Sequence, residues 1–211
     1  DPYWDRPVLV GGLCGICPVG PHLAPGKAMD QRAGVDELPP AAEKVRRLMH
    51  YGQILQSHAL HFFHLSSPDL LFGFDSEPAR RNLVGLVEKH PDLARQGVLL
   101  RKFGQEVIRI TAGKRIHGTC AIPGGVNKAL DPDERDYLQQ EIAPIVDWGR
   151  QALDLARRLF QEAREQNRRF ARIDTPMMGM VRDAGAPELY HGALRCTGCD
   201  GAPILTQDDS R

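Results

Sequence analysis

Two cysteines separated by two residues constrain this chain more than any other feature of its sequence. Cys14 and Cys17 can turn their sulfur atoms toward one point, and Gly15 between them lets the backbone fold closely around whatever lies there. The spacing alone is compatible with a redox dithiol, zinc, an iron–sulfur cluster or a nickel–iron centre, since thiolates ligate all of these metals. The pair therefore indicates half of a metal site, whose chemistry depends on the sequence around it.

Composition and charge describe a folded chain without a preference for polyanions. Its 211 residues are 42% hydrophobic and 26% charged, which is enough to bury one substantial core. The 27 basic and 27 acidic side chains cancel, so we expect neither nucleic acid nor an anionic membrane as a partner. No apolar run is long enough to span a bilayer, so we expect no membrane insertion. Five cysteines, an odd number, do not form a closed disulfide framework, which favours the cytoplasm.

Helical patterns separated by Pro and Gly turns cover the first half of the chain. Residues 1–12 have no clear pattern and are expected to be irregular, and a short helix after the dithiol should end near Gly34. The strongest helical pattern runs over 41–65, and the run Ser66-Ser67-Pro68 should stop it. Three more helices are expected over 78–90, 91–97 and 99–111.

Turn and cap residues organise the second half. Gly113 is expected to cap the preceding helix, and Asp131 followed by Pro at the first helical position should open a long helix toward Arg172. Pro144 should kink or divide that helix. The segments 189–195 and 202–206, separated by a Gly-rich turn, are typical of a β-hairpin. The predicted fold class is therefore mainly α (α+β), with a small β-hairpin near the C-terminus.

Three histidines of the 41–65 helix share one side of it. His50, His61 and His64 could ligate zinc or a carboxylate-bridged metal. No Glu-x-x-His motif accompanies them, and histidines in large helical proteins more often satisfy buried hydrogen bonds. We therefore favour a structural role for the three histidines.

Four blocks follow the dithiol in order along the chain. They are Leu-Met-His-Tyr-Gly-Gln at 48–53, Gln-Ser-His-Ala-Leu-His-Phe-Phe-His-Leu-Ser-Ser-Pro-Asp-Leu-Leu-Phe-Gly-Phe-Asp at 56–75, Leu-Arg-Lys-Phe-Gly-Gln-Glu at 100–106, and Ala-Gly-Lys-Arg-Ile-His-Gly-Thr at 112–119 with Pro-Gly-Gly-Val at 123–126. With the run Leu-Cys-Gly-Ile-Cys-Pro-Val-Gly-Pro-His at 13–22, they resemble the large subunits of nickel–iron hydrogenases, most closely the NAD-reducing (bidirectional) type. The resemblance implies the helical bundle of that large subunit, a fold shared with a complex I subunit.

The resemblance implies roles for the cysteines and for one histidine. Cys14 would be a terminal thiolate on nickel, and Cys17 a thiolate that bridges nickel and iron, in a centre whose iron carries carbonyl and cyanide ligands. His117 lies in a block that approaches the metal centre in the family. A hydrogen-bonding role just outside the metal ligands is implied for His117, with plain loop structure as the equal alternative.

The resemblance also implies an activity and partners. The intact oxidoreductase would interconvert H2 with protons and electrons. Electrons would pass through iron–sulfur clusters of a small subunit to FMN and NAD in diaphorase subunits. A cofactor F420- or viologen-linked hydrogenase is the enzymatic alternative. A non-catalytic structural or assembly module, with a metal bound at the Cys-x-x-Cys pair, is the alternative from another class.

The chain departs from the family pattern in four places. Family members usually carry Arg two residues before the first cysteine and His four residues after the second, where this chain has Gly12 and Pro21, with His22 one residue later. The family's upstream acidic motif and its second pair, Asp-Pro-Cys-x-x-Cys-x-x-His, do not occur. We therefore expect 1–211 to be a single incomplete domain and an internal fragment, inactive alone, with a helical core over about 22–172 and a small β region over about 186–207.

A second pair, Cys196 and Cys199, invites a four-thiolate zinc or iron–sulfur interpretation. It lacks the Asp-Pro before it and the His after it that mark the family's second pair. Gly198 and Gly201 serve a turn at the same place, so a structural or incidental role is favoured over metal binding. Cys120 has an apolar context and is expected to be a small core residue.

Overall fold

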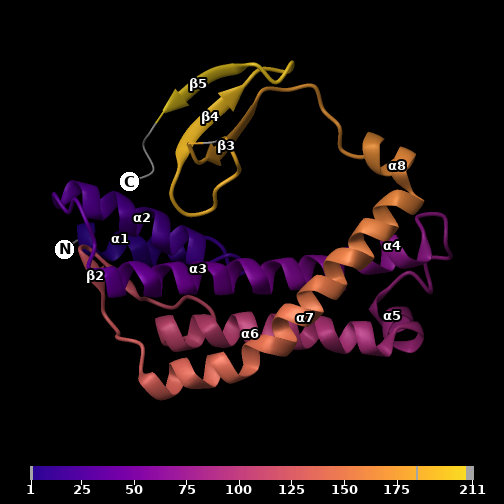
Figure 1. The fold of residues 1–211 in the computed structure, drawn as a ribbon, viewed down its shortest axis with the longest axis horizontal. Helices are drawn as coiled ribbons and strands as arrows, with labels where there is room; N and C mark the ends of the chain where they lie inside the picture. Colours follow the sequence, from indigo (N-terminus) through magenta and orange to yellow (C-terminus); the bar gives the residue numbers. More distant parts are fainter. Residues whose placement is uncertain (1, 184, 208–211) are drawn as a thin grey trace. The chain divides into compact units, whose positions relative to one another are not determined.

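The computed structural model describes residues 2–183 and 185–207, which form two compact units that meet in the sequence between Glu162 and Ala163. The first unit is helical with one short β-hairpin, and the second combines a short helix with a three-stranded sheet (Figure 1). The mainly α class with a small β region is confirmed. That 1–211 is a single incomplete domain stays a prediction.

The elements of the first unit are α1 (Pro2–Gly11), α2 (Val19–Arg32), α3 (Pro40–Leu60), the π-helical segment η1 (His61–Ser66), α4 (Ser67–Phe72), α5 (Leu83–Lys89), α6 (Pro91–Ala112), β1 (Ala121–Ile122), β2 (Gly125–Val126) and α7 (Pro132–Glu162). The second unit contains α8 (Arg164–Arg169), β3 (Met177–Val181), β4 (Ala193–Thr197) and β5 (Pro203–Gln207).

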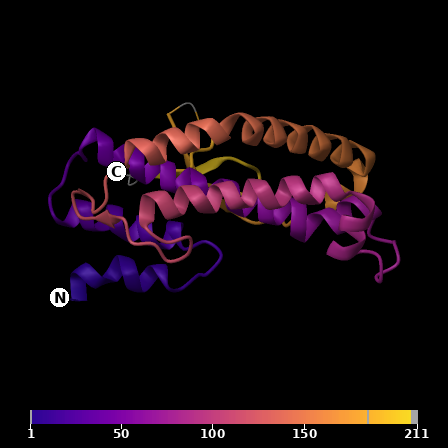
Figure 2. The same cartoon turned by 90° about the horizontal axis from the view of Figure 1, so that it is seen from below.

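Helices α3 and α6 form the largest helix–helix contact and lie side by side in both views (Figures 1 and 2). Their close approach depends on glycine. A Cβ atom on Gly104 would lie 2.6 Å from the Gly52 carbonyl oxygen, and one on Gly52 would lie 2.7 Å from Val107 Cγ1. A side chain at either glycine would force the two helices apart. The 48–53 and 100–106 blocks therefore meet in space.

The core of the helical unit extends from the α3–α6 pair to α7. One cluster of buried side chains contains Ala59, Phe63, Leu100 and Ile145. A second contains Val107, Ile110 and Leu138. Both clusters join α6 to α7, and the first also includes side chains of α3 and η1. Burial of apolar surface at these contacts holds the three long helices together.

The prediction that residues 1–12 are irregular was wrong. Residues 2–11 form α1, which packs against α2. Pro7 inside this ten-residue segment removes a backbone donor and hides the helical pattern. A tertiary contact offsets the weak local preference, because the ring of His22 donates a hydrogen bond from Nδ1 to the Pro7 carbonyl at 3.3 Å.

The prediction that Ser66-Ser67-Pro68 stops the 41–65 helix was also wrong. The helix passes from α3 through η1 into α4. A π turn pairs each carbonyl with the amide five residues later, and Pro68 has no N–H to offer the Phe63 carbonyl. The Ser67 hydroxyl donates to that carbonyl instead, at 2.6 Å, and so lets the helix continue.

The helices expected over 91–97 and 99–111 are one helix, α6, while the helix expected over 78–90 is the shorter α5. Gly97 does not break α6, because it lies buried where Phe63 of η1 packs against it. The prediction that Gly113 caps α6 is confirmed: it has φ 79° and donates to the Arg109 carbonyl at 2.8 Å.

Helix α7 begins as expected, since Asp131 Oδ1 accepts the Asp133 amide at 2.8 Å. It is not divided at Pro144, and it ends at Glu162 rather than near Arg172. The residues around Pro144 are exposed, so water can satisfy the carbonyl that the proline leaves without an intrahelical donor. The short helix α8 follows after Ala163.

The second unit confirms the predicted hairpin and adds a strand. Strands β4 and β5 pair antiparallel, and β3 pairs antiparallel with the other edge of β4. The sheet therefore begins at Met177, earlier than the expected start near 186. The sequence Met-Met-Gly-Met-Val of β3 has no alternation of apolar and polar residues, so the period-two pattern of a strand does not appear there.

Candidate metal centre

The Cys14–Cys17 loop joins α1 to α2 and brings its two sulfur atoms into contact. The structure joins them as a disulfide, with Cα atoms 5.6 Å apart, and both residues are half-buried. The Cys17 amide also donates to Cys14 Sγ at 3.2 Å. The two sulfur atoms lie close together, and a backbone N–H points at one of them. In the reduced state, with both cysteines as thiolates, this arrangement suits a shared metal ion.

Helix α3 holds the middle of this loop through two glutamines. Gln53 and Gln56 donate their side-chain amides to the Ile16 carbonyl at 3.0 and 3.1 Å. Both glutamines are buried, and they lie three residues apart on one face of the helix. The position of the peptide between the cysteines is therefore set by residues about forty positions away in sequence rather than by the loop alone.

His22 ties the start of α2 to the segment that leads into the β1–β2 hairpin. Its Nε2 accepts the amides of Cys120 and Ala121, each at 3.0 Å, while Nδ1–H donates to the Pro7 carbonyl. These three partners specify the neutral ring with its proton on Nδ1. Burial lowers the pKa of His22 below its usual 6.5, the bond to Pro7 opposes this, and Arg46 lowers it further.

A buried ion pair supports the other side of the β1–β2 hairpin. Arg46 is fully buried and bonds to the Asp30 carboxylate at 2.5 and 3.2 Å. It also donates to the carbonyls of Gly125 and Ile122, both at 2.8 Å, while Asp30 accepts the Gly124 amide at 2.8 Å. A buried ion pair is tolerated when further hydrogen bonds satisfy its remaining donors and acceptors. The hairpin carbonyls and the Gly124 amide supply those bonds here.

His117, the histidine that the resemblance singled out, lies close to the start of the dithiol loop in space. Its Nδ1 donates to the Gly11 carbonyl at 3.0 Å, across 106 residues of sequence, although the residue itself is exposed. Its backbone has φ 54°, in the left-handed region that few residues other than glycine adopt. A hydrogen-bonding role for His117 toward a bound metal centre stays a prediction.

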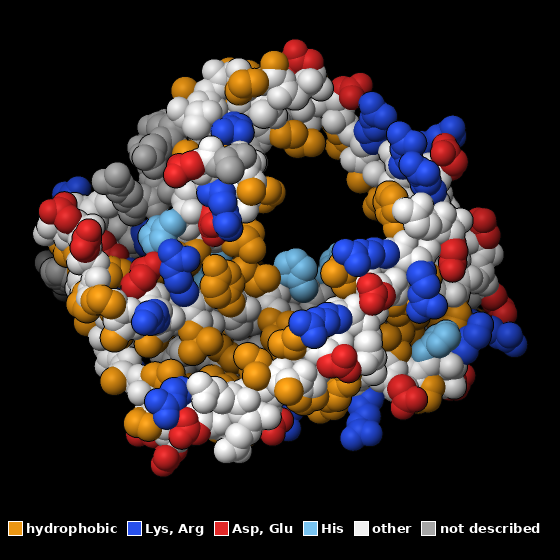
Figure 3. Space-filling view, viewed as in Figure 1, with side chains coloured by type: hydrophobic (Ala, Val, Ile, Leu, Met, Phe, Trp, Pro, Cys, Tyr) orange, Lys and Arg blue, Asp and Glu red, His pale blue; other side chains and the backbone are white. Residues whose placement is uncertain are grey.

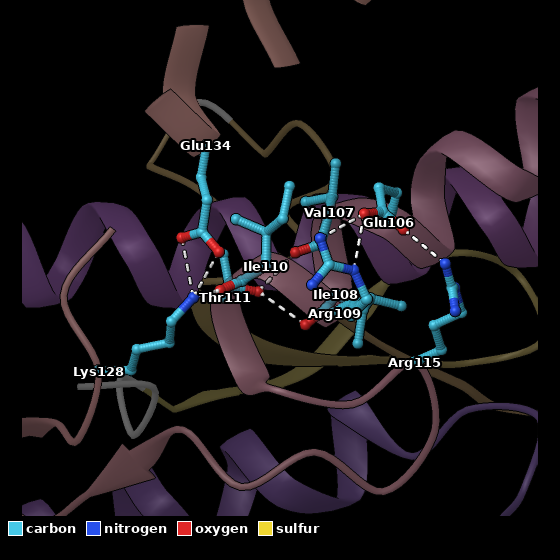
Figure 4. Close-up of polar contacts among 9 residues, drawn as sticks. All are labelled: Glu106, Val107, Ile108, Arg109, Ile110, Thr111, Arg115, Lys128 and Glu134. Carbon is cyan, nitrogen blue, oxygen red and sulfur yellow. Dashed lines mark hydrogen bonds and ion pairs between the residues drawn. The ribbon is translucent and has the colours of Figure 1, made fainter. Parts of the chain in front are cut away.

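Two ion clusters hold the segment between α6 and α7 (Figure 4). Glu106 contacts Arg109 at 2.5 Å and Arg115 at 2.9 Å, and the hydrogen bond from Arg109 holds the pKa of Glu106 below its usual range. Lys128 bonds to Glu134 at 2.8 Å and to the Ile110 carbonyl at 2.5 Å. The clusters anchor both ends of the loop that carries His117 and Cys120.

The remaining candidate ligands do not gather around the dithiol. No three His, Cys, Asp or Glu side chains within residues 2–183 and 185–207 are placed to hold a metal ion together. His50, His61 and His64 are spread over α3 and η1, where His61 contacts the Ser66 hydroxyl at 3.3 Å. Their structural role stays a prediction.

The other cysteines separate into one core residue and one surface pair. Cys120 is fully buried, which confirms it as a core residue, and burial raises its pKa to about 11. Cys196 lies on β4 and Cys199 in the following turn, both with free thiols. The predicted turn is confirmed, since the Gly198 amide donates to the Ala202 carbonyl at 2.8 Å.

Apolar side chains surround the dithiol at the surface. Leu13 is 81% exposed and Ile16 is 52% exposed, next to the two cysteines. Elsewhere on the helical unit, acidic and basic side chains are interspersed over the face drawn in Figure 3. Within the part of the chain that the structure describes, no helix is both long and apolar enough to cross a membrane.

Sequence reasoning missed the residues that position the loop. Gln53 and Gln56 lie in two of the matching blocks, and their spacing on one helix face was the available signal. Arg46 and Asp30 carry no such signal, because their shared partner is a hairpin about eighty residues after Arg46. The only signal for His22 in the sequence is that it lies one residue after the position where the family usually has a histidine. In the structure it makes three hydrogen bonds to backbone groups.

Comparison with known proteins gives consistent relatives. The nickel-dependent hydrogenase family matches residues 2–72. One component of the F420-non-reducing hydrogenase vhu from Methanocaldococcus jannaschii is 41% identical over 200 residues, which are 95% of this chain and 47% of the relative. The beta subunit of the NAD-reducing hydrogenase HoxS from Cupriavidus necator is 42% identical over an alignment of 205 positions, and the match covers 92% of this chain and 42% of the relative.

A solved structure of an NAD⁺-reducing NiFe-hydrogenase in the H2-reduced state superimposes with a TM-score of 0.90 and 50% identity. The match covers 99% of this chain and 46% of that chain. The chain thus spans about half the length of the relatives that it matches, and the expected helical fold is confirmed over nearly all of it.

Proposed function

Because this chain belongs to the nickel-dependent hydrogenase family, we propose that it forms part of the large subunit of an NAD-reducing nickel–iron hydrogenase. In this proposal Cys14 is a terminal ligand of nickel and Cys17 bridges nickel and iron, whose further ligands are carbonyl and cyanide. When bound, such a centre supplies the reversible conversion of H2 into protons and electrons. Among the described residues no third His, Cys, Asp or Glu joins Cys14 and Cys17 in a ligand cluster, so in this proposal the other ligands come from elsewhere in the intact subunit.

The convergence of the two sulfurs carries this proposal. Two thiolates that share one metal pair must lie together, and the loop holds Cys14 and Cys17 in contact. The bond from the Cys17 amide to Cys14 Sγ stabilises negative charge on that sulfur, as a thiolate ligand requires. Gln53 and Gln56 hold the Ile16 carbonyl, so the peptide between the cysteines keeps one orientation.

The residues around the loop hold its neighbouring elements in place. Arg46 and Asp30 lock the β1–β2 hairpin against α2 and α3, and neutral His22 spans α1, α2 and the segment before β1. A frame of buried hydrogen bonds of this kind orders the ligand loop before the metal binds, so metal binding costs little further conformational entropy. His117 completes the proposed frame through its bond to Gly11.

The electron acceptor is the finer part of the proposal. The 50% identity to an NAD⁺-reducing hydrogenase supports NAD as the acceptor. We propose that electrons reach it through iron–sulfur clusters of a small subunit and FMN in diaphorase subunits. The F420-non-reducing hydrogenase relative is 41% identical, close to the 42% of the HoxS beta subunit, so that class is the second candidate. We propose the cytoplasm as the location, as for other NAD-linked chemistry, and the odd number of cysteines agrees with a reducing compartment.

The exposed apolar residues beside the dithiol support a protein partner at this site. Leu13 and Ile16 expose much of their apolar surface next to the half-buried cysteines. Exposed apolar side chains beside a site are available for contact with another protein surface. We therefore place the contact with the iron–sulfur small subunit and with the rest of the large subunit around this loop.

The test compares the 211-residue chain with the intact large subunit that contains it, each expressed with the cell's hydrogenase maturation system. We expect nickel and iron in the intact subunit, H2-dependent reduction of NAD⁺ in its complex, and neither metal retention nor dye reduction by the 211-residue chain alone. Reduction of viologen dye without NAD⁺ reduction would favour the second candidate. An intact subunit without nickel would contradict the proposal and favour a non-catalytic module.

A further inference from the structure

The β4–β5 hairpin brings two thiols to one end of the small sheet. Cys196 is half-buried on β4, and Cys199 is exposed in the turn that follows. Gly201 adopts φ 82°, and the Gly198 amide bonds to the Ala202 carbonyl at 2.8 Å, so the chain reverses immediately after β4. A spacing of three residues across such a tight turn places both sulfurs at the same end of the hairpin.

A third sulfur comes from the neighbouring strand. Met178 of β3 is the register partner of Cys196. Residues directly opposite each other in an antiparallel pair project to the same face, with Cβ atoms about 4.5 to 5.5 Å apart. The side chains of Met178 and Cys196 therefore leave the sheet next to each other on one face. Met178 is 71% exposed, which leaves its sulfur accessible to a ligand.

We propose that Cys196, Cys199 and Met178 form a three-sulfur site for a soft monovalent cation of the Cu(I) class. Thiolate and thioether sulfur are soft donors, and soft ligands favour Cu(I) over harder divalent ions. Structural zinc takes four ligands, and the described residues supply no cluster of three or more His, Cys, Asp or Glu. The site does not depend on the proposed nickel–iron centre.

Binding at this site changes no oxidation state. Each thiol that ligates the ion releases one proton to water, and the thioether donates a lone pair without losing a proton. The reaction therefore needs no oxidant or reductant. A disulfide between Cys196 and Cys199 would remove both thiolates, so the site requires the free thiols that the structure has at both positions.

The experiment titrates Cu(I) anaerobically into the reduced 211-residue chain, in competition with the chromophoric chelator bicinchoninate. The chain carries Cys14→Ser and Cys17→Ser so that the first dithiol cannot bind copper. We expect one copper ion per chain, lost in the Cys199→Ser variant. Mutation of a residue that only hydrogen-bonds to a metal ligand typically lowers metal affinity by roughly 10- to 100-fold. Met178→Leu removes a proposed ligand itself, so it should lower the copper affinity by at least about tenfold.

Met177→Leu is the matched control. Met177 is 59% exposed and pairs with Thr197, so it lies next to Met178 but projects to the opposite face of the sheet. We expect its copper affinity to equal that of the reference chain, and circular dichroism checks that each variant is folded. Equal affinities of the Met177→Leu and Met178→Leu variants would overturn the three-sulfur site. Failure to retain Cu(I), or one zinc ion shared by two chains, would also overturn it.

Discussion

The two Cys-x-x-Cys pairs have the same spacing, but different parts of the chain determine their shapes. Around Cys196 and Cys199 the turn is closed by its own backbone, since Gly198 bonds to Ala202 and Gly201 bonds to the Gly198 carbonyl. Around Cys14 and Cys17 the loop is held by glutamines 37 and 40 residues beyond Ile16. The turn around Cys196 and Cys199 therefore needs only the hairpin that contains it. The loop around Cys14 and Cys17 needs helix α3 of the folded helical unit.

The largest expected effect separates the two pairs directly. In the intact large subunit, Cys17→Ser should abolish nickel retention and H2-dependent dye reduction, because it removes a proposed bridging thiolate. Cys196→Ser should leave both nearly unchanged, since its proposed metal is a different one. Metal analysis and the dye assay measure the two outcomes. Equal loss in both variants would contradict the assignment and favour one four-thiolate site.

The next prediction concerns the buried frame that only the first pair possesses. Arg46→Met should lower the free energy of unfolding of the helical unit by about 3–5 kcal/mol, because it leaves the Asp30 carboxylate buried without its charge partner. Arg47→Met is the matched control: its partner Glu43 is partly exposed, so the loss should be about 0–1 kcal/mol.

Urea unfolding followed by circular dichroism measures both changes, and hydrogen exchange reports on each pair separately. The Gly198 amide should keep its protection in the Arg46→Met variant, since its bond to Ala202 lies within the hairpin. A loss of less than about 1 kcal/mol for Arg46→Met would contradict the role given to the ion pair.

A smaller effect should appear as a pH dependence of the first pair's surroundings. His22 has a lowered pKa when folded, so below pH 6.5 the unfolded chain binds a proton that the folded chain does not. Stability from neutral His22 is therefore complete above pH 6.5 and falls as the pH decreases toward the lowered folded value, by up to about 1.4 kcal/mol per pH unit.

Urea unfolding between about pH 5 and pH 8, the range in which histidine titrates, tests this dependence in two variants. His22→Gln should have a shallower slope than the unmodified chain, because the titrating group is gone. His58→Gln should keep the slope, because His58 is exposed and bonds only to the Ile54 carbonyl one turn away. The same slope in all three proteins would show that His22 does not control acid stability.

The smallest expected effect concerns the loop itself. Gln53→Leu removes one of the two donors to the Ile16 carbonyl, and a hydrogen bond of this kind contributes about 0.5–1.5 kcal/mol. The Cys17 amide should then exchange faster, while the Gly198 amide should not change. Gln96→Leu is the control, since Gln96 contacts Gln151 at the surface. Unchanged exchange at Cys17 would mean that the loop keeps its shape without α3.

Much of the fold follows from local signals. The caps at Gly113 and Asp131, the helix that starts at Pro40 and the β4–β5 hairpin were predicted because each depends on backbone preferences of a few neighbouring residues. Two of the errors arose where a distant group offset a local signal, whereas at Ser66-Ser67-Pro68 the nearby Ser67 hydroxyl did so. Pro7 lies in a helix held by His22, and Gly97 lies in a helix packed against Phe63.

By itself the sequence determined the two dithiols, the helical class and, through its ordered blocks, the family resemblance. Only the tertiary structure decided which residues support the first dithiol. Gln53, Arg46 and His22 find their partners between 15 and 99 residues away. The spacing of Gln53 and Gln56 indicates that they share a helix face, but it does not identify the carbonyl that they bind. The reason is physical: a buried polar group must be paired, but the partner depends on which helices pack together, and that packing is set by the whole core.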